Sequence, residues 1–489
     1  MTRTARNIVV AVLACLVAAA LAAPAGAARG DLMASRSHAG RRAAGGGGRG
    51  HLSFTKPVAL EAFSPARTAA STVYSARNGE EPSDHEWSGE PVIQVDDKGI
   101  IYIAGTCCVV ASSPVWRSTN NGKKFTEMES PGHVREWGIG AEGDLAVDHK
   151  GNVFFVDTYI PGLLMSAWSD HGKSWEYTIP ANGVVPGFDD RPWLAYSNKA
   201  LYLYVNHVSH TAVYSSADGG QTWSTAGPLS WDGSPLGQPY FPGHIAAHEK
   251  TGELWVSGVV THNDESVLGS AVSKDGGQTF TEAVISKPQR KDGFSPIFTG
   301  TTAVDSAGNG YATWSTYDKK GCDVYYAAST NGGKSWRDPV KVNTGPGCAT
   351  FPWVTAGANG KIALAWYETP ATKTADPGQL ALRTLSGRTI YNGLELPLLA
   401  FQDEVADDAP WYLHVAAIRK AGAASPRIAE ARVPTKTPVL LGPLDRELWD
   451  FLQLDIGPDG RVHVTYSDKY KDSAPQTWYV GTKGGPRLR

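Results

Sequence analysis

Residues 216–223, SADGGQTW, recur along the chain at nearly regular intervals. Close copies begin at Ser273 (SKDGGQTF) and Ser329 (STNGGKSW), and looser copies begin at Ser118 (STNNGKKF) and Trp168 (WSDHGKSW). Intervals of roughly 50 residues mark a repeated structural unit, and a repeat has to be interpreted before any single element.

A second pattern, consisting of an apolar strand, a turn rich in Asp, Asn and Gly, and another apolar strand, precedes these turns. It is clear in EPVIQVDDKGIIYIAG from Glu90 and in GDLAVDHKGNVFFVD from Gly143. Further copies begin at Arg191, Gly243, Gly300, Phe351 and Phe451. Such segments are typical of β-hairpins. After each of the first five hairpins come a third strand, the repeated turn and a fourth strand, which predicts the four-stranded antiparallel blade of a β-propeller.

The fold class predicted is therefore an all-β propeller of seven blades, with six blades as the alternative. The Asp or Asn at the third position of each repeated turn can accept hydrogen bonds from turn amides, and the aromatic residue at its end can pack between blades. The last blade has only about three strands in the sequence, so a segment upstream of Trp87 is expected to supply the fourth and close the ring. A long insertion, residues 369–409, is expected to overhang the ring as a lid or wall.

The repeated turns resemble the Asp-box, or BNR, repeats of the sialidase-like β-propeller superfamily, in its secreted bacterial type. The resemblance extends from about Trp87 to Val480. It implies a ligand site at the mouth of the central channel and an extracellular carbohydrate or similar polar ligand. Members of the family that hydrolyse sialic acid usually have six blades.

The N-terminal region is expected to lie outside the propeller. Residues 1–27 contain two arginines, an apolar run and the small residues AGA, which is typical of a secretory signal peptide. Residues 28–70 are predicted to be a basic, Gly-rich linker without fixed structure, and residues 71–489 a single propeller. A secreted protein is therefore expected, and lipoprotein anchoring through Cys15 is disfavoured because the apolar run continues past it.

The composition excludes several classes of partner. The net charge of −3 does not predict binding to nucleic acid or to an anionic membrane, and no segment after the signal peptide is apolar enough to span a bilayer. No cofactor motif is present, so none is expected, and the protein is expected to be a monomer.

The predicted strand order places the loops that enter the first strand and leave the second strand of every blade on one face. The resemblance implies that ligands bind at that face. Candidate catalytic residues there are Glu142, Asp144, Tyr159 and Asp190. Candidate ligand-binding residues are Arg135, Arg191, His207, His244, Asp318, Tyr367 and Glu368.

Structural alternatives remain for several of these candidates. Asp190 and Arg191 can form an ion pair that anchors a blade entrance, and Glu142 and Asp144 can bind turn amides. His207 and His244 can be hydrogen-bonded loop histidines, since no close spacing of histidines predicts a metal site.

Sialic acid hydrolysis requires an arginine cluster for the substrate carboxylate, a Tyr–Glu nucleophile and an Asp that serves as acid and base. Arg191 is well placed and Arg135 is a further candidate, but a third arginine is missing. The arginine-bearing Phe/Tyr-Arg-Ile-Pro segment of the family is replaced by EPVIQV at residues 90–95. Glycoside hydrolysis is the leading hypothesis, a non-catalytic binding or scaffolding propeller is the alternative, and a hydrolase or lyase for neutral polysaccharides is a third.

Four cysteines follow the signal peptide, an even number that suits an oxidising compartment. Cys322 opens a third strand and Cys348 precedes the next first strand, so both lie on the same face of adjacent blades and are predicted to form a disulfide. Cys107 and Cys108 are then left as a vicinal disulfide, with a reduced pair or pairing to the other two cysteines as alternatives.

Overall fold

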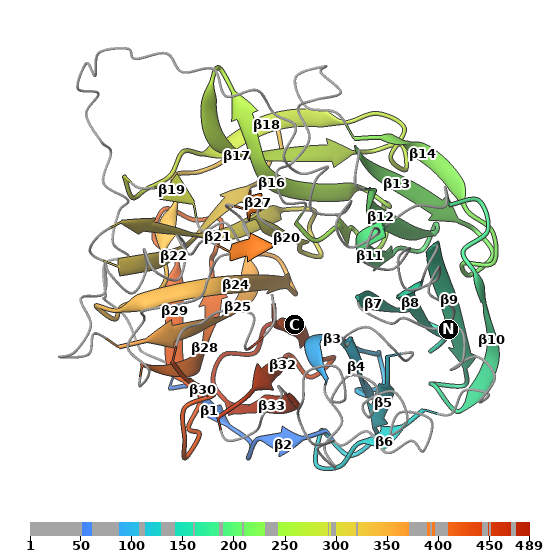
Figure 1. The fold of residues 1–489 in the computed structure, drawn as a ribbon, viewed down its shortest axis with the longest axis horizontal. Coiled ribbons are helices and arrows are strands. Elements are labelled where there is room, and N and C mark those ends of the chain that lie inside the picture. Colours follow the sequence, from blue (N-terminus) through green and yellow to red (C-terminus); the bar gives the residue numbers. More distant parts are fainter. Residues whose placement is uncertain are drawn as a thin grey trace.

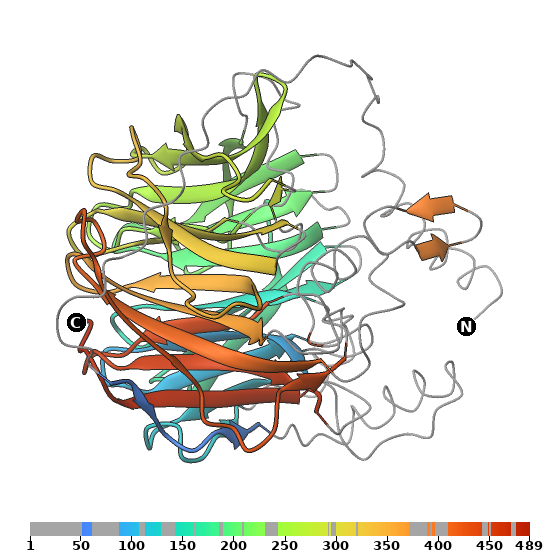
Figure 2. The ribbon, with the colours of Figure 1, turned by 90° about the vertical axis from the view of Figure 1, so that its left-hand side faces the viewer.

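The computed structural model describes residues 51–60, 88–106, 113–128, 142–159, 162–184, 189–207, 210–229, 243–291, 293–294, 300–318, 321–370, 389–391, 394–396, 409–442, 448, 451–470 and 476–489. In this part of the chain β-strands form sheets arranged in a ring around a central axis (Figure 1). Seen from the side, the ring is a disc with the C-terminus at one face (Figure 2). The predicted all-β propeller class with four-stranded antiparallel blades is confirmed.

Five blades are separate sheets. The first contains β3 (Gly89–Val95), β4 (Ile101–Thr106), β5 (Val115–Ser118) and β6 (Thr126–Glu127). The second contains β7 (Gly143–Val147), β8 (Val153–Tyr159), β9 (Gly162–Ser169) and β10 (Ser174–Pro180). The third contains β11 (Asp189–Tyr196), β12 (Leu201–His207), β13 (His210–Ser216) and β14 (Ser224–Pro228). The fourth contains β15 (Ala246–Ala247), β16 (Leu254–His262), β17 (Glu265–Ser273) and β18 (Thr281–Ser286).

The remaining separate blade joins the two ends of the described chain. It contains β31 (Gln453–Ile456), β32 (Val462–Asp468), β33 (Gln476–Gly484), β1 (Ser53–Phe54) and β2 (Val58–Ala59). The early strands β1 and β2 both pair with β33, which confirms that a segment upstream of Trp87 completes the last blade. Residues 51–60, the described part of the range 28–70 that was expected to be a linker, are therefore part of this sheet.

A ten-stranded sheet completes the ring. It contains β19 (Gly293–Phe294), β20 (Thr301–Val304), β21 (Gly310–Asp318), β22 (Gly321–Ser329), β23 (Val340–Lys341), β24 (Cys348–Ala356), β25 (Lys361–Thr369), β28 (Pro410–Arg419), β29 (Arg427–Arg432) and β30 (Leu440–Leu441). Within the insertion, β26 (Thr389–Tyr391) and β27 (Leu394–Leu396) pair with each other.

The prediction of seven blades, or six, is wrong: the described residues form five separate blades and one ten-stranded sheet. The strands predicted as the fifth and sixth blades, β20 to β23 and β24, β25, β28 and β29, belong to the one ten-stranded sheet. They are continuous because β22 and β24 pair in parallel where Cys322 lies opposite Cys348. Sequence patterns define each antiparallel hairpin but do not report this contact between neighbouring units.

Burial follows the position of each strand in its blade. The middle strands β22 and β25 are buried along nearly their whole length, because the neighbouring units cover both faces. The outer strand β10 has no fully buried residue. The sequence reflects this difference: GCDVYYAAS and KIALAWYET are nearly continuous apolar runs, whereas SWEYTIP is mixed.

The repeated turns join third and fourth strands and have the predicted hydrogen bonds. In the copy between β13 and β14, Ser216 Oγ accepts the amide of Gly220 at 2.8 Å, and Asp218 Oδ1 accepts the amide of Thr222 at 3.0 Å. The second glycine of each turn approaches the preceding blade. A Cβ on Gly277 would lie 2.8 Å from Cβ of Ala226, which explains why this position lacks a side chain.

Candidate active site at the channel mouth

Three first strands of the ring, β3, β11 and β24, contain near their start a non-glycine residue in the left-handed region, immediately before a proline. These residues are Glu90 (φ 45°), Arg191 (φ 61°) and Phe351 (φ 54°). At each of them the pairing with the second strand shifts register, which is the mark of a β-bulge. Bulges redirect side chains, and strained backbone of this kind is concentrated at functional sites.

The redirected Arg191 forms the centre of an ionic cluster at the channel mouth. Its Nη1 donates to Oε2 of Glu90 at 2.5 Å, and its Nη2 lies 3.2 Å from Oε1 of the same carboxylate. Its Nη2 also lies 3.4 Å from Oε1 of Glu142, and its backbone amide donates to Oε2 of Glu142 at 2.5 Å. One arginine therefore joins carboxylates from two other blades.

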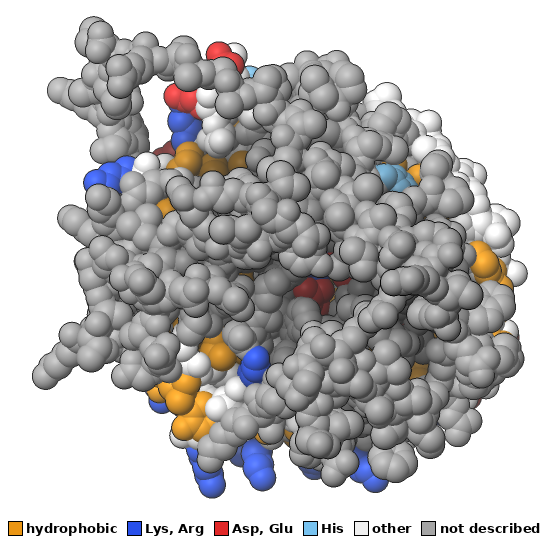
Figure 3. Space-filling model, in the orientation of Figure 1, with side chains coloured by type: hydrophobic (Ala, Val, Ile, Leu, Met, Phe, Trp, Pro, Cys, Tyr) orange, Lys and Arg blue, Asp and Glu red, His pale blue; other side chains and the backbone are white. Residues whose placement is uncertain are grey.

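The members of this cluster differ in exposure. The side chains of Glu90 and Arg191 are 5% and 9% exposed, whereas that of Glu142 is 17% exposed. Viewed along the axis, acidic side chains are visible in a hollow at the centre of this face (Figure 3). Glu142 is thus the carboxylate of the cluster that is most accessible to a ligand entering from solvent.

Asp144 lies deeper, and neighbouring first strands already occupy its oxygens. Oδ2 accepts the amide of Leu194 at 2.9 Å and lies 3.3 Å from Nε2 of His244. Oδ1 accepts the amide of Leu145 and, at 3.3 Å, Nε2 of Gln453. The residue is completely buried. These contacts suit an anchor between first strands; the amides belong to β7 and β11, not to a turn as the structural alternative for Asp144 had it.

Aromatic side chains close the axis beneath the cluster. The ring centroid of Trp193 lies 5.5 Å from that of His244, 5.4 Å from that of Trp353 and 5.1 Å from that of Phe451. The Arg191 guanidinium carbon lies 5.5 Å from the centroid of Phe451, so the cation rests on this aromatic plug.

A cavity of about 240 Å³ lies along the first strands on the other side of the plug. His244 and Trp353 line it, as does Arg489 near the C-terminus. Asp455 also lines it, accepts the amide of Val95 at 2.8 Å, and has its pKa raised by burial. Glu90, Glu142 and Arg191 are not among its described lining residues, so the plug separates the channel mouth from this cavity.

Three other predicted residues have partners in the blades. His207 is 5% exposed, and its Nε2 lies 2.8 Å from Oη of Tyr214. Tyr367 Oη accepts the amide of Ser467 at 3.0 Å, and burial raises the pKa of this phenol. Glu368 belongs to a different cluster between strands of the ten-stranded sheet, and burial raises the pKa of its carboxyl. The structure thus brings Glu142, Asp144, Arg191 and His244 together around the axis but not these three.

The other predicted residues are only partly described. Strand pairing places the backbones of Asp190, Tyr159 and Asp318 opposite Asn206, Gly162 and Gly321 respectively, and their side chains lie outside the described part. Arg135, Cys107 and Cys108 lie outside the described residues altogether, as does the range 1–27.

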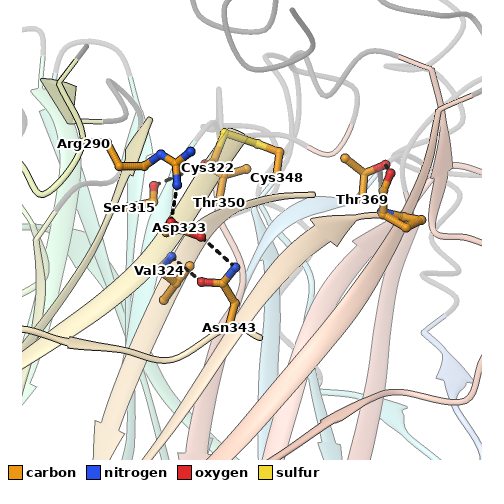
Figure 4. Close-up of a disulfide and its surroundings, with 10 residues drawn as sticks. Arg290, Ser315, Cys322, Asp323, Val324, Asn343, Cys348, Thr350 and Thr369 are labelled. Carbon is orange, nitrogen blue, oxygen red and sulfur yellow. Dashed lines mark hydrogen bonds and ion pairs between the residues drawn. A yellow bond between two sulfur atoms is a disulfide. The ribbon is translucent and has the colours of Figure 1, made fainter. Parts of the chain in front are cut away.

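The disulfide between Cys322 and Cys348 is confirmed, and it lies where β22 and β24 meet. Beside it, Asp323 binds Arg290 and accepts Nδ2 of Asn343 at 3.2 Å (Figure 4). Asp323 also pairs with Lys341. A charged group with this many partners indicates a structural junction between the two predicted blade units.

The strand order placed Glu90 at this face, but neither Glu90 nor the plug residues Trp193, Trp353 and Phe451 were predicted as catalytic or ligand-binding. A signal for the first of these was present, because Glu90 and Arg191 share the same position before a proline at the start of a first strand. Two residues of opposite charge at equivalent positions of a ring can converge on its axis.

No protein-family model matches the sequence, and no curated protein matches it, so the resemblance to Asp-box propellers stays a prediction. Among solved structures, a protein of unknown function from Dyadobacter fermentans is similar with a TM-score of 0.45 and 12% identity, over 90% of this chain and 99% of that one. The arabinanase of Penicillium chrysogenum complexed with arabinobiose gives a TM-score of 0.37 and 12% identity, over 81% and 93% of the two chains. The GH93 arabinofuranosidase of Fusarium graminearum complexed with arabinobiose gives a TM-score of 0.38 and 12% identity, over 81% of this chain and 92% of that one. TM-scores and identities this low assign no chemistry to this chain.

The described residues include no helix with the length and hydropathy needed to cross a bilayer.

Proposed function

We propose that this protein is an exported, sialidase-like propeller that hydrolyses glycosidic bonds at the channel mouth, with Glu142 as the carboxylate that meets the sugar. The observation that carries the proposal is the contact of Glu142 with Arg191, which leaves the Glu142 side chain 17% exposed at the axis. A carboxylate beside a guanidinium stays ionised, as a nucleophile or general base has to be.

The neighbouring residues take supporting roles in this proposal. Glu90 holds the guanidinium of Arg191 through both of its terminal nitrogens and so fixes the direction of the charge that faces Glu142. We assign the proton donor to Asp190, one of the candidate catalytic residues, which precedes Arg191 in the chain. The aromatic plug beneath excludes water from one side of the cluster, which strengthens its electrostatic contacts.

The arginine content favours a neutral sugar. Among the described residues, only Arg191 belongs to this cluster, whereas recognition of sialic acid needs several converging guanidinium groups. Arg191 is already shared by two carboxylates and is poorly placed to clamp a third one from a substrate. We therefore expect neutral glycosides to be better substrates than sialosides.

A non-catalytic glycan-binding propeller is the second candidate. It is favoured by the low exposure of Glu90 and Arg191 and by the pairing of both glutamates with one cation. Such a largely buried, ion-paired cluster can hold blades together without reacting. In that case glycans would bind over the channel mouth and leave unchanged.

Both candidates can be tested with the purified protein on a panel of aryl glycosides, neutral and sialylated, beside a glycan-binding array. Hydrolysis by the wild-type protein that falls at least about 1,000-fold in Glu142→Gln, with glycan binding retained, supports the enzyme. Glu253→Gln is the matched control, since Glu253 is paired with Lys274 in the fourth blade. Full activity in Glu142→Gln would overturn the assigned role, and binding without hydrolysis by the wild-type protein would select the second candidate.

A further inference from the structure

A second cluster of chemically reactive side chains lies away from the axis, on one face of three adjacent strands in the ten-stranded sheet. It consists of Glu368 on β25, His414 on β28 and Glu430 on β29. The register pairs His414 with Trp366 on one side and with Arg432 on the other, so each glutamate lies two residues from a direct partner of His414. Such diagonal neighbours are within reach of one another on the same face.

The three side chains converge. One possible ligand atom from each lies within 4.8 Å of the others. Nδ1 of His414 is 3.7 Å from Oε2 of Glu368 and 3.4 Å from Oε1 of Glu430. Neither glutamate is bound closely enough to the imidazole for a strong hydrogen bond, so the centre of the cluster is a shared space surrounded by an imidazole nitrogen and carboxylate oxygens.

The cluster is buried and its charge is unbalanced. The exposed fractions of the side chains are 7% for Glu368, 12% for Glu430 and 16% for His414. In the described part of the chain, His414 is the only group that forms an ion pair with either glutamate. Two buried carboxylates facing a single imidazole are costly, because one histidine can supply at most one positive charge.

One oxygen of Glu368 lacks a donor among the described residues. Its Oε2 accepts Nε1 of Trp366 at 2.8 Å, whereas no hydrogen bond from a described residue reaches Oε1. Gly345 lies beside that oxygen and leaves room for it, since a Cβ at this position would lie only 2.1 Å away. A carboxylate oxygen that no described donor reaches keeps its lone pairs for coordination of a cation.

We propose that Glu368, His414 and Glu430 bind a divalent transition-metal ion such as zinc. Imidazole nitrogen and carboxylate oxygen are both zinc ligands. Calcium and magnesium prefer sites made of oxygen ligands alone, so the imidazole of His414 favours zinc over these two ions. A dication balances the two carboxylates while the histidine stays neutral.

The surroundings of the glutamates suit such a site. Trp366 holds the carboxylate of Glu368, and Oγ1 of Thr344 donates to Oε2 of Glu430 at 3.1 Å. Donors of this kind orient metal ligands in proteins. The ion joins β25, β28 and β29 to one another. Thr344, in the loop after β23, contacts Glu430 on this side of the sheet. The ion therefore also stabilises the junction of the two predicted blade units.

The test measures zinc binding by the full-length protein after a chelator has removed bound metal. Isothermal titration gives the affinity, and thermal unfolding gives the shift in Tm on adding zinc. We expect one zinc ion whose affinity falls at least 10-fold in Glu430→Gln and in His414→Gln, together with loss of the zinc-induced rise in Tm. Glu430→Gln is the milder change, because the glutamine can still accept the hydrogen bond from Thr344, so it decides the question if the histidine variant fails to fold.

His149→Gln is the matched control. His149 also contacts two carboxylates, Asp97 at 2.8 Å and Glu249 at 3.3 Å, but through different ring nitrogens that cannot converge on one ion. Its removal should leave the zinc affinity unchanged. Zinc binding that is absent in the wild-type protein, or that is equally tight in wild type and Glu430→Gln, would overturn the proposal.

Discussion

The side chains that meet at the axis depend on a few residues with unusual backbone. Glu90, Arg191 and Phe351 adopt positive φ values directly before prolines, a conformation that costs about 1–3 kcal/mol at each position. The ionic cluster and the contact of Arg191 with Phe451 offset part of that cost. Backbone strain and ion pairing are thus coupled at this site, since without the charged contacts nothing offsets the conformational cost at Glu90 and Arg191.

Replacing Arg191 tests this coupling. Arg191→Met should lower the free energy of unfolding by about 3–5 kcal/mol, because it removes the cation that pairs with the buried Glu90 and the partly buried Glu142. Arg191→Lys should cost less, about 1–2 kcal/mol, because a lysine keeps the charge but loses the planar fork. Urea unfolding followed by tryptophan fluorescence measures both.

The matched control is Arg461→Lys, at a pair with Asp459 whose side chains are 35% and 50% exposed, where we expect a change within about 0.5 kcal/mol. An Arg191→Met variant as stable as the wild type would show that the cluster contributes nothing to folding. A stable Arg191→Lys variant with weakened glycan binding would instead support direct contact between Arg191 and the ligand.

A second residue makes stability depend on pH. Burial lowers the pKa of His463 from 6.5 to about 4, and its Nδ1 lies 2.8 Å from Oη of Tyr479. A histidine whose pKa is depressed in the folded state stabilises the protein above the pKa of the unfolded chain, and this stability is lost as the pH falls from 6.5 towards 4.

We therefore expect His463 to account for a loss on the order of 2 kcal/mol in unfolding free energy between pH 7 and pH 5. Urea titrations at the two pH values should show a smaller pH dependence in His463→Gln than in the wild type. His149→Gln should act in the opposite sense, since its contact with Asp97 raises the pKa of His149. An unchanged pH dependence in His463→Gln would contradict the assignment.

At the scale of the elements, the repeated turns connect each blade to the one before it. Gly277 lies against Ala226 and Gly333 against Val272, in both cases with too little room for a Cβ. The first copy makes the same contact across the point where the ring closes, since Gly122 lies against the ring of Tyr479 on β33. The glycine of the repeat therefore serves a contact between blades as well as the turn itself.

Gly122→Ala separates these two roles from each other. A Cβ there would lie 1.9 Å from the Tyr479 ring, and the ring cannot move easily because it is buried, packs against Phe125 at 5.1 Å and hydrogen-bonds His463. Gly308 is the control: its φ of 82° is close to the 73° of Gly122, but nothing lies within 4 Å of a Cβ. Gly122→Ala should be at least about 2 kcal/mol more destabilising than Gly308→Ala in urea unfolding. Equal costs would mean that only backbone strain matters at these turns.

At the scale of the whole molecule, the ring is closed by strands from opposite ends of the chain. Ser53 pairs with Gly484 and Val58 with Tyr479, and Leu52 and Leu60 are 3% and 4% exposed. Without β1 and β2, the strand β33 would present an unpaired edge and the two leucines would be lost from the core.

A chain that begins at residue 61 should consequently have a Tm lower by more than about 5 °C and should aggregate more readily than one that begins at residue 51. Differential scanning fluorimetry and light scattering measure the two effects. Equal Tm values would show that the ring is stable without its N-terminal strands.

Several features followed from the sequence alone because they are local. The alternation of strand and turn predicts the four-stranded antiparallel blades, and the Ser, Asp and Gly positions of the repeat predict the turn hydrogen bonds seen around Ser216 and Asp218. The Cys322–Cys348 bridge also followed, since both cysteines have defined positions in the strand order.

Other features were decided only by the tertiary structure, because they depend on distances between residues far apart in the chain. Glu90 and Arg191 are 101 positions apart and meet only because bulges direct both towards one axis. The number of separate sheets depends on one parallel contact between β22 and β24, to which no local pattern corresponds. Glu368 was predicted as a channel-mouth residue, yet it faces His414 and Glu430, since the twist and pairing of the ten-stranded sheet determine which face of a buried strand meets which neighbour.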